Sequence, residues 1–519
     1  MCSARTLLVV TLLLAGPARL AAETGTGEPL SAIDWLSKSV ATPAAMPAPG
    51  AVTAEPPVAK SVTQTAISIL PLDAPSLDAI GLSSVARTGL PRDLWGTTAS
   101  ADLARLIRAE RVHTLPAIQS LLYRLLLAEL APPADSDGQG TVFLARIDKL
   151  LDLGALDPAL ALLEQVDDPP PEVFRRRFDV ALLTGEEDHA CEVMRKTPGI
   201  SPTFEARVFC LARGGDWNAA ALSLRTGETL GYIDADMVPL LERFLDPELA
   251  DGAPDLPAPA RPSPLVLRLM EAIGEPLQTS TLPLAFAHAD LNSNAGWKTR
   301  LDAAERLART GAIEPNLLLG LYTEREAAAS GGVWERVRAV QTLDRAIADS
   351  DRAAVARTLP QAWQLVEAQE LEVPFAALFG ESLARMDLDG AAGALAFRIA
   401  LLSDGYERVA KGRTPRDDSE AFLIGLATGD GSATVPPDQM GAAIKAAFTG
   451  AADPAPEFAA LVSERRLGEA LLEAIDQITD GARGDLRDVT EGLVFLRHVG
   501  LETTARRAAL ELVLLERRG

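Results

Sequence analysis

The chain has 519 residues, of which 48% are hydrophobic and 5% aromatic. This length and apolar content suffice for two or more globular units and exclude a chain that is disordered throughout. The formal net charge is −23, and no cluster of lysine and arginine with interleaved aromatic residues occurs, which excludes a nucleic acid partner. Alanine and leucine dominate the apolar residues and β-branched runs are scarce, so we predict an all-α fold.

The first 22 residues have the pattern of a secretory signal peptide. Arg5 precedes an apolar stretch from Leu7 to Ala15, and small residues follow it. An apolar stretch of about ten residues fits a signal peptide, whereas a membrane span needs about 20. We predict cleavage near Ala22 and a periplasmic or secreted mature chain. No later stretch is long and apolar enough to span a bilayer, so no transmembrane segment is expected in the mature chain.

Residues 23–99 are predicted to form a mostly disordered segment rich in proline and alanine. Seven prolines between residues 43 and 75 interrupt any helix there, because proline lacks the backbone amide hydrogen. Two small apolar groups in this segment, around Trp35 and around Ile69, are either short docking strips or incidental residues of a tether.

A second proline cluster, residues 247–264, is predicted to be a linker. It separates a helical block of residues 100–246 from a longer block of residues 265–519. Helical periodicity is clear in the second block, where Val333 and Val337 begin a series of apolar residues spaced by three or four. The pattern as a whole predicts about fourteen to sixteen helices joined by short turns, with a hinge between the two blocks.

Two cysteines, Cys191 and Cys210, remain after the predicted cleavage. They fall in successive predicted helices, and an antiparallel hairpin of these helices would bring them to a similar height. An oxidising compartment permits a disulfide between them, but free cysteines are also common in protein cores. The sequence therefore leaves both alternatives open.

A pattern of Leu-x-x-Gly-x-x-x-x-Ala recurs along the chain. Its glycines are Gly154, Gly185 and Gly214, spaced 31 and 29 residues apart, and Gly500 begins a further copy with Ala505. The spacing fits a helix, a turn, a second helix and another turn. We expect each glycine to end the first helix of a pair in a left-handed conformation. The alanine five residues later allows the second helix to approach closely.

In these residues the chain resembles the tetratricopeptide-like (TPR-like) α-helical repeat proteins of the bacterial envelope, which share a glycine before the turn and a small residue about five positions later. The resemblance covers about residues 145–230 and about the last twenty residues. The period is shorter than the usual 34 residues, and the aromatic residue near each repeat start is mostly missing. The resemblance implies a helical-repeat solenoid of helix-turn-helix pairs in two blocks, of which residues 100–246 form the N-terminal TPR-like block.

The sequence contains no pattern typical of a catalytic or metal site, so we predict no catalytic residue, no cofactor and no bound metal. The four histidines are far apart in sequence, and zinc-binding spacings are absent. Glu381 and Ser382 match the residue pair of lytic transglycosylases, but Leu383 and its successors continue a helix. Asp290 and Asn294 have the spacing of a calcium loop, yet Asn294 is better explained as a helix N-cap.

The best candidate for a binding surface is the stretch from Tyr322 to Trp334. Ser330, Gly331 and Gly332 open a helix there, and an open helix start exposes backbone N–H groups that can bind an anion or a carboxylate. Tyr322 and Trp334 would add aromatic contact area. The alternative is a plain helix start with a buried tryptophan.

The function expected from these features is that of an exported, non-enzymatic interaction scaffold of the cell envelope, which binds a protein partner through a helical-repeat surface. The alternative is an envelope enzyme that acts on peptidoglycan or another glycan, or an activator of such an enzyme. Two of the 72 acidic residues would then work as a pair, with carboxyl groups about 5 to 9 Å apart in a cleft. The sequence predicts no oligomeric state.

Overall fold

The computed structural model describes residues 76–291, 294–450 and 453–515. Helices account for 66% of these residues, and no β-strand occurs among them. A single isolated bridge in this part of the chain joins Ser83 and Ala128. The all-α prediction is therefore confirmed. The predicted signal peptide, residues 1–22, and the predicted disorder of residues 23–75 lie outside the described residues.

The described residues contain 25 α-helices, numbered α2 to α26, and five short 3₁₀ helices. The first ten are α2 (Val85–Thr88), α3 (Ser100–Ala109), α4 (Pro116–Leu127), α5 (Thr141–Asp152), α6 (Leu156–Leu163), α7 (Pro171–Thr184), α8 (Glu187–Lys196), α9 (Phe204–Arg213), α10 (Trp217–Leu230) and α11 (Val238–Leu245). The next eight are α12 (Pro264–Ala272), α13 (Ala287–Asp290), α14 (Trp297–Arg309), α15 (Pro315–Thr323), α16 (Val333–Ala348), α17 (Arg352–Glu367), α18 (Glu372–Arg385) and α19 (Gly390–Ala400). The last seven are α20 (Tyr406–Lys411), α21 (Asp418–Thr428), α22 (Gln439–Thr449), α23 (Pro456–Ser463), α24 (Leu467–Gly481), α25 (Leu486–His498) and α26 (Glu502–Leu514). The 3₁₀ helices are η1 (Leu77–Ala79), η2 (Pro198–Ile200), η3 (Pro247–Ala250), η4 (Thr279–Thr281) and η5 (Leu284–Phe286).

The described residues contain more helices than the fourteen to sixteen expected, in part because some helices are very short. α2, α13 and α20 have 4, 4 and 6 residues, which is too few to show a helical period in the sequence. Within the described part of the chain, none of the helices combines the length and the apolar character that crossing a membrane requires.

Left-handed turns end several helices, as the repeat pattern predicts. Gly154, Gly185 and Gly500 have φ angles of +74°, +86° and +85°. After each of these glycines, the next N–H donates to the carbonyl oxygen five residues before it, at 2.8 Å. This hydrogen bond closes the helix end, and the following helix packs against the one just ended.

One copy of the pattern is displaced by one residue. Gly214 has a right-handed φ of −74°, and the left-handed residue is Gly215, at +82°. The buried alanine is accordingly Ala220, at 0% exposure, whereas Ala219 is only half-buried. The expectation for Gly214 and Ala219 was wrong, because two consecutive glycines leave the turn position undetermined in the sequence.

The same turn also occurs without glycine. Ser350, Glu370 and Arg465 have φ angles of +56°, +54° and +60° and follow α16, α17 and α23. After each, the next N–H donates to the carbonyl five residues before it, at 2.9 to 3.0 Å. These turns carry no glycine signal, so the sequence pattern could not include them.

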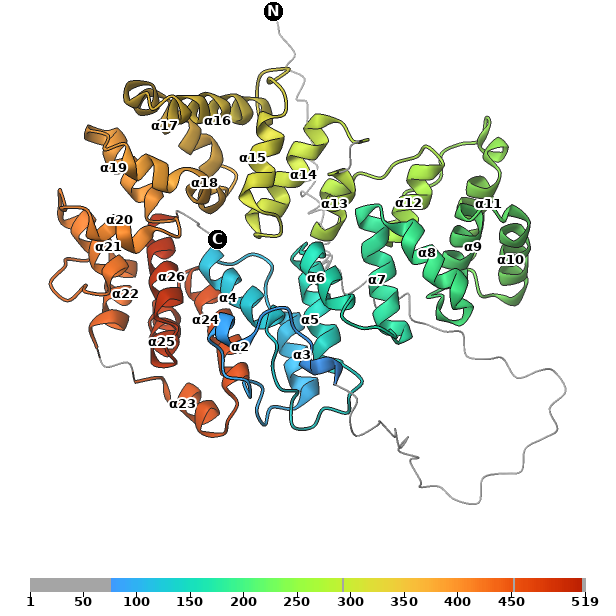
Figure 1. Ribbon diagram of the computed structural model, residues 1–519, viewed down its shortest axis with the longest axis horizontal. Coiled ribbons are helices and arrows are strands. Elements are labelled where there is room, and N and C mark those ends of the chain that lie inside the picture. Colours follow the sequence, from blue (N-terminus) through green and yellow to red (C-terminus); the bar gives the residue numbers. More distant parts are fainter. Residues whose placement is uncertain (1–75, 292–293, 451–452, 516–519) are drawn as a thin grey trace, which may run out of the picture.

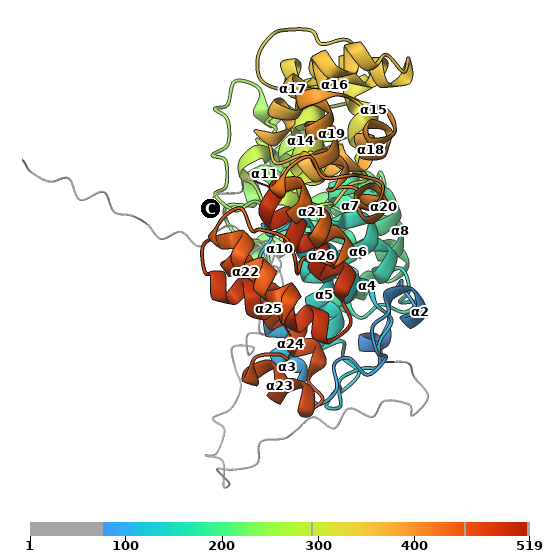
Figure 2. The same ribbon diagram turned by 90° about the vertical axis from the view of Figure 1, so that its left-hand side faces the viewer.

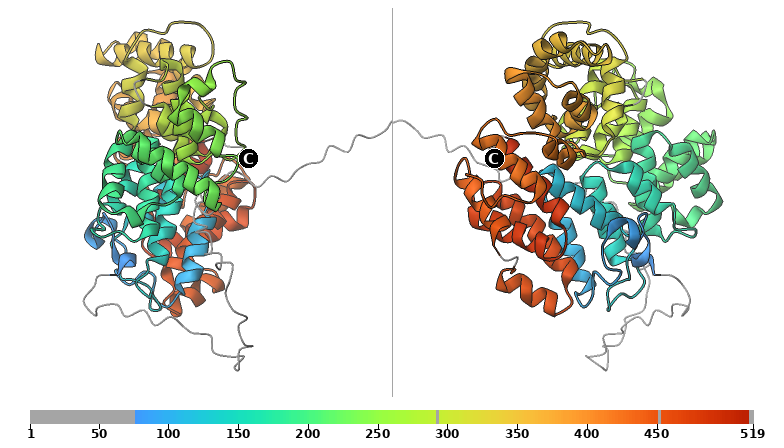
Figure 3. Two further views of the ribbon diagram at one scale, coloured as in Figure 1. Left: turned by 90° about the vertical axis from the view of Figure 1, so that its right-hand side faces the viewer. Right: turned by 60° about the vertical axis from the view of Figure 1, so that its left-hand side comes forward.

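The helices follow a curved path that brings the two ends of the described chain together. Near the C-terminus, α24 packs against α3 and α4, and α26 packs against α4. Figure 1 shows the red C-terminal helices beside the blue and cyan N-terminal ones, and Figures 2 and 3 show the same neighbours from other sides. Helices α8 to α11, in green, extend to one side as an arm (Figure 1).

Buried apolar residues form two clusters. The larger cluster extends from Leu90 to Leu183 and from Leu267 to Leu515, so it contains helices from both sides of the proline-rich stretch 247–264. The smaller cluster belongs to the arm and the helices next to it. The proline-rich stretch leads from α11 to α12, and α12 packs back on α7. The main core is therefore shared by the two stretches of chain that residues 247–264 separate.

Residues 76–99 fold against the core, although they were expected in the disordered segment. Leu94 and Trp95 are 0% and 1% exposed, and the Leu94 carbonyl accepts the Gly468 N–H of α24 at 2.9 Å. A Cβ atom at Gly468 would lie 2.5 Å from the Trp95 ring, so this glycine makes room for the ring. The expectation was wrong for these residues, because the surfaces that bury them lie outside the segment: α5 and Ala128 for residues 77–83, and α24 for Trp95.

Cys191 of α8 and Cys210 of α9 form a disulfide, with their Cα atoms 5.1 Å apart. The two helices pack against each other in the arm. The cross-link reduces the number of conformations open to the unfolded chain. It thereby stabilises the arm, whose apolar cluster is the smaller of the two.

Candidate functional site

Tyr322, expected on a binding surface, is buried in the core. Its hydroxyl donates to Glu305 Oε1 at 2.7 Å, and Arg336 Nε donates to the same oxygen at 2.8 Å. Burial, together with the Glu305 charge, raises the pKa of Tyr322 well above its usual value, so the phenol remains a neutral donor. These hydrogen bonds link α14, α15 and α16. The Tyr322 side chain therefore stabilises the core and does not form part of a binding surface.

The other residues of the expected surface lie in and after the loop that precedes α16. Ser330, Gly331 and Gly332 are exposed, and the two glycines have φ angles of +87° and +55°. Trp334 is half-buried, with its ring centre 5.1 Å from that of Trp297. The predicted residues are therefore divided between the core and an exposed loop, and they do not form one surface.

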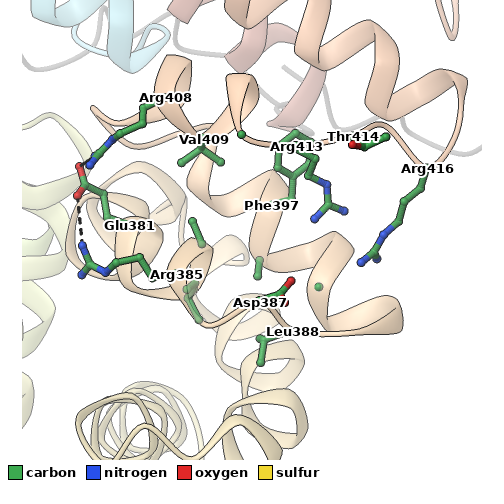
Figure 4. A pocket seen from close by; sticks show the side chains of 15 residues that line it. Glu381, Arg385, Asp387, Leu388, Phe397, Arg408, Val409, Arg413, Thr414 and Arg416 are labelled. Carbon is green, nitrogen blue, oxygen red and sulfur yellow. Dashed lines mark ion pairs between the residues drawn. The ribbon is translucent and has the colours of Figure 1, made fainter.

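A pocket elsewhere gathers arginine side chains. It has a volume of about 450 Å³ and lies where the end of α18 and the helix α19 face α20 and the loop before α21 (Figure 4). The charged residues that line it are Arg385, Arg408, Arg413, Arg416, Glu381 and Asp387. We refer to it as the arginine pocket. Four cations beside two acids, in a chain of net charge −23, favour the binding of an anionic group.

Arg385 and Arg408 form an exposed rim of the arginine pocket. Their side chains are 68% and 69% exposed, and they lie 3.8 and 2.6 Å from the oxygens of Glu381. Two guanidinium groups thus share one carboxylate, which leaves net positive charge on the rim. Exposed ion pairs contribute only about 0 to 1 kcal/mol, so a carboxylate of a ligand can compete with Glu381.

Arg413 and Arg416 belong to the opposite wall. Arg413 binds both oxygens of Glu420, at 2.5 and 3.1 Å, and lies 4.4 Å from the centre of the Phe397 ring. Arg416 is exposed and donates to the Gly390 carbonyl at 3.0 Å. Figure 4 shows both guanidinium groups extending toward the side of the pocket that holds Asp387. The bidentate pair and the ring contact hold Arg413 in a fixed position.

The sequence did not reveal this pocket, because its arginines come from α18, from α20 and from the loop between α20 and α21. No spacing pattern in the sequence predicts that these segments meet. Glu381 drew attention only as half of a Glu-Ser pair. In the structure its carboxylate binds arginines, and Ser382 accepts a hydrogen bond from Arg385 at 3.1 Å. A signal did exist in the sequence, because Arg408, Arg413 and Arg416 lie close together in an acidic chain.

A second cavity, of about 630 Å³, lies between α3, α5, α14 and the loop after α24. Glu110 lines it and is 6% exposed. Burial, assisted by the charge of Asp476, raises the pKa of Glu110 to about 8, so this carboxyl is mostly protonated at neutral pH. Lys149 Nζ donates to the Glu110 carbonyl at 2.7 Å and to Asp152 at 3.1 Å. We refer to this space as the central cavity.

Within the described residues, no group of three or more histidine, cysteine, aspartate or glutamate side chains is placed to hold a metal ion. No protein-family model, no curated protein and no solved structure matches the chain.

Proposed function

We propose that the chain is an exported, non-enzymatic binding protein of the cell envelope, which holds an acidic segment of a partner protein in its arginine pocket. The observation that carries the proposal is the convergence of four arginines on one pocket in a chain of net charge −23. Complementary charge accelerates the encounter with an acidic partner and orients it. Arginine is also among the residues that contribute most to protein interfaces.

The partner segment carries an apolar side chain beside its acidic ones. Leu388, Phe397 and Val409 line the pocket between the arginines, and an apolar side chain of the partner would cover them. Carboxylates on either side of this apolar side chain would then replace Glu381 as the ion-pair partners of Arg385 and Arg408. Apolar burial supplies affinity in this arrangement, and the charges supply orientation.

A TPR-like framework of helix pairs is part of the proposal. It is supported by the left-handed turn that recurs after α5, α7, α9, α16, α17, α23 and α25. Buried alanines follow several of these turns by five residues, among them Ala159, Ala190 and Ala470. Stacked helix pairs offer extended surfaces to partner proteins.

Export is proposed on the N-terminal sequence pattern and on the disulfide between Cys191 and Cys210, because disulfides persist in oxidising compartments. Mass spectrometry of the protein recovered from its cell is expected to find Glu23 at the N-terminus. Recovery of the protein only with its first 22 residues attached would contradict export.

A second function, that of a glycan-acting enzyme or its activator, has one observation in its favour. Glu110 and Asp152 both line the central cavity, and a protonated carboxyl such as Glu110 is what a general acid requires. Asp152, however, is paired with the buried Lys149 at 3.1 Å. The cavity also carries more cations than acids, and a neutral sugar gives them no counter-charge. The binding function is therefore favoured.

The arginine pocket is tested by fluorescence anisotropy with a labelled peptide of alternating glutamate and leucine, titrated with the full chain. We expect saturable binding that weakens as salt is added. Charge reversal of both rim arginines, Arg385→Glu with Arg408→Glu, is expected to weaken binding at least about tenfold, because two charge-assisted contacts are lost. Both side chains are exposed, so the variant is expected to fold.

Each rim substitution is also made singly, and the matched control for it is Arg357→Glu, which reverses one exposed arginine of α17 outside the pocket. A peptide with lysine in place of glutamate is the second control. The proposal fails if the rim variant binds the acidic peptide as tightly as the unchanged chain does, or if the lysine peptide binds equally well.

A further inference from the structure

The central cavity is lined by parts of the chain that are far apart in sequence. Its walls come from the end of α3 and the loop after it, from α5, from the last turn of α14 and from the loop after α24. The closure of the C-terminal helices on α3 and α4 places these walls together. The cavity therefore exists only in the folded protein, and it is separate from the arginine pocket.

The lining of the central cavity is strongly cationic. Six cationic side chains line it, Arg108, Arg111, Lys149, Arg306, Arg309 and Arg483, against the two carboxyl groups of Glu110 and Asp152. Because burial keeps Glu110 mostly protonated at neutral pH, its carboxyl adds little negative charge and can donate a hydrogen bond. Carboxylates next to the lining, Asp148 and Asp480, balance part of the remaining charge through ion pairs with Arg108 and Arg111.

Arg306 and Arg309 are the least compensated of these cations. They lie three residues apart and therefore on the same face of α14. Arg306 donates to the carbonyls of Thr279 and Leu282, both at 3.0 Å. Arg309 donates to the carbonyl and side-chain oxygens of Gln369, at 2.6 and 2.9 Å. Among the described residues, neither arginine forms an ion pair with a carboxylate.

The two guanidinium groups also repel each other. The pKa of Arg306 is lowered first by burial and also by the nearby charge of Arg309, against the opposing effect of Asp290. Carbonyl dipoles orient a guanidinium group but do not cancel its full charge. A bound anion between Arg306 and Arg309 would offset both the repulsion and the loss of hydration.

The opposite wall holds further cations in fixed positions. Arg108 lies 3.1 Å from Asp148, which is buried, and Arg111 forms an ion pair with Asp480 and lies 3.7 Å from Asp476. Lys149, which is 2% exposed, is held between the Glu110 carbonyl and Asp152. These contacts position the cations in advance, so that little ordering is needed when a ligand enters.

We propose that the central cavity binds a small anion with at least two negative charges, whose phosphate or carboxylate groups contact Arg306 and Arg309 on one side and Lys149 on the other. A volume of about 630 Å³ is within the range of small-molecule sites. The planar guanidinium group binds two oxygens of a phosphate or a carboxylate at once. Partial burial strengthens these contacts compared with the same contacts in water.

Isothermal titration calorimetry of the full chain at pH 7 and low ionic strength tests this site, with pyrophosphate and with citrate in separate titrations. We expect a single saturable site for at least one of them, and the anion that binds more tightly identifies phosphate or carboxylate as the preferred group. Arg309→Gln is expected to weaken binding about tenfold because it removes a guanidinium group that contacts the anion, and Arg483→Gln is expected to do the same because it removes a further cation that lines the cavity. Arg306 is left unchanged because it holds two backbone carbonyls, those of Thr279 and Leu282, whereas Arg309 holds one, that of Gln369.

The control is Arg105→Gln, which removes an arginine of α3 that is 66% exposed and does not line the cavity; it is expected to bind the anion as the unchanged chain does. Circular dichroism verifies that each variant is folded. The proposal is overturned if neither anion binds saturably at millimolar concentration, or if folded Arg309→Gln and Arg483→Gln bind with unchanged affinity. It is equally overturned if binding is lost in the rim variant of the arginine pocket and retained in Arg309→Gln.

Discussion

Glu110, at the end of α3, is a carboxyl group that folding removes from water. Burial is the main cause that raises its pKa from 4.5 to about 8, with a smaller contribution from Asp476. The folded protein thus favours the protonated carboxyl, whereas the unfolded chain ionises it at its ordinary pKa. The stability that Glu110 contributes is fully present below pH 4.5 and is lost as the pH rises to about 8.

Glu110→Gln is therefore expected to raise the free energy of unfolding at pH 9, because the amide has no charge to bury. The gain is expected to be roughly 2 to 4 kcal/mol at pH 9 and less than about 1 kcal/mol at pH 5, because pH 5 lies only slightly above the ordinary pKa of 4.5 at which the unfolded chain ionises this carboxyl. Urea denaturation at the two pH values measures it.

The matched control for Glu110→Gln is Glu335→Gln, at an exposed position of α16. It makes the same chemical change without releasing a buried carboxyl. If the two variants have the same pH dependence of stability, burial of Glu110 is not the cause of the effect.

At the scale of the element, the left-handed turn is the unit that the chain repeats. Glycine takes the left-handed position at Gly154, Gly185, Gly215 and Gly500, because its missing Cβ removes the steric cost of positive φ. These turns differ in their surroundings. A Cβ atom at Gly154 would lie 2.8 Å from Leu307 and 2.9 Å from Leu284, whereas a Cβ atom at Gly500 would have no neighbour within 4 Å.

A comparison of Gly154→Ala with Gly500→Ala separates two free-energy costs: that of a left-handed alanine and that of a methyl group added to the core. Gly500→Ala is expected to lower the free energy of unfolding by about 1 to 2 kcal/mol, which is the cost of the left-handed conformation. Gly154→Ala is expected to cost about 1 to 3 kcal/mol more, because the added methyl group overpacks the core. Chemical denaturation of both variants measures the difference. Equal losses would mean that Leu307 and Leu284 move aside without cost.

At the scale of the whole molecule, a few hydrogen bonds join the ends of the described chain. Glu511 of α26 is 2% exposed, and its Oε2 accepts the Ala117 N–H at 2.8 Å. It thereby satisfies a donor at the first turn of α4, whose own N-cap residue, Leu115, has no side-chain acceptor. The hydroxyl groups of Thr114 and Thr479 lie 2.6 Å apart and add a second contact between these ends.

Glu511→Gln is expected to lower the free energy of unfolding by about 1 to 3 kcal/mol, because a charge-assisted hydrogen bond inside the protein is weakened. Amide hydrogen exchange is expected to accelerate at the first turn of α4, nearly four hundred residues away in sequence. Mass spectrometry of exchange in peptides from α4 measures this local effect.

The control for Glu511→Gln is Thr503→Ala, an exposed position of the same helix. It is expected to leave exchange in α4 unchanged. Faster exchange throughout the molecule in Glu511→Gln, without any excess at α4, would contradict a capping role for Glu511.

The contrast between Ser330 and Tyr322 illustrates how much of the site the sequence could predict. Glycines and a polar residue before an apolar helix indicate a helix start after Ser330, because this signal is local, and the structure begins α16 at Val333 after an exposed loop. The burial of Tyr322 depends on Glu305 and Arg336, which come from two other helices. A tyrosine on an amphipathic helix has the same pattern whether its partner is a core carboxylate or another protein.

The sequence by itself determined the all-α fold, and it identified three of the four repeat glycines as left-handed, because helix periodicity and helix ends depend on residues within a few positions. Only the tertiary structure decided that α24 and α26 close on α3 and α4, that residues 76–99 join the core, and which arginines converge in each pocket. Many pairs of helix faces could bury the same apolar side chains, so periodicity cannot choose among them. That choice depends on shape and on buried polar partners, such as Glu511 at α4.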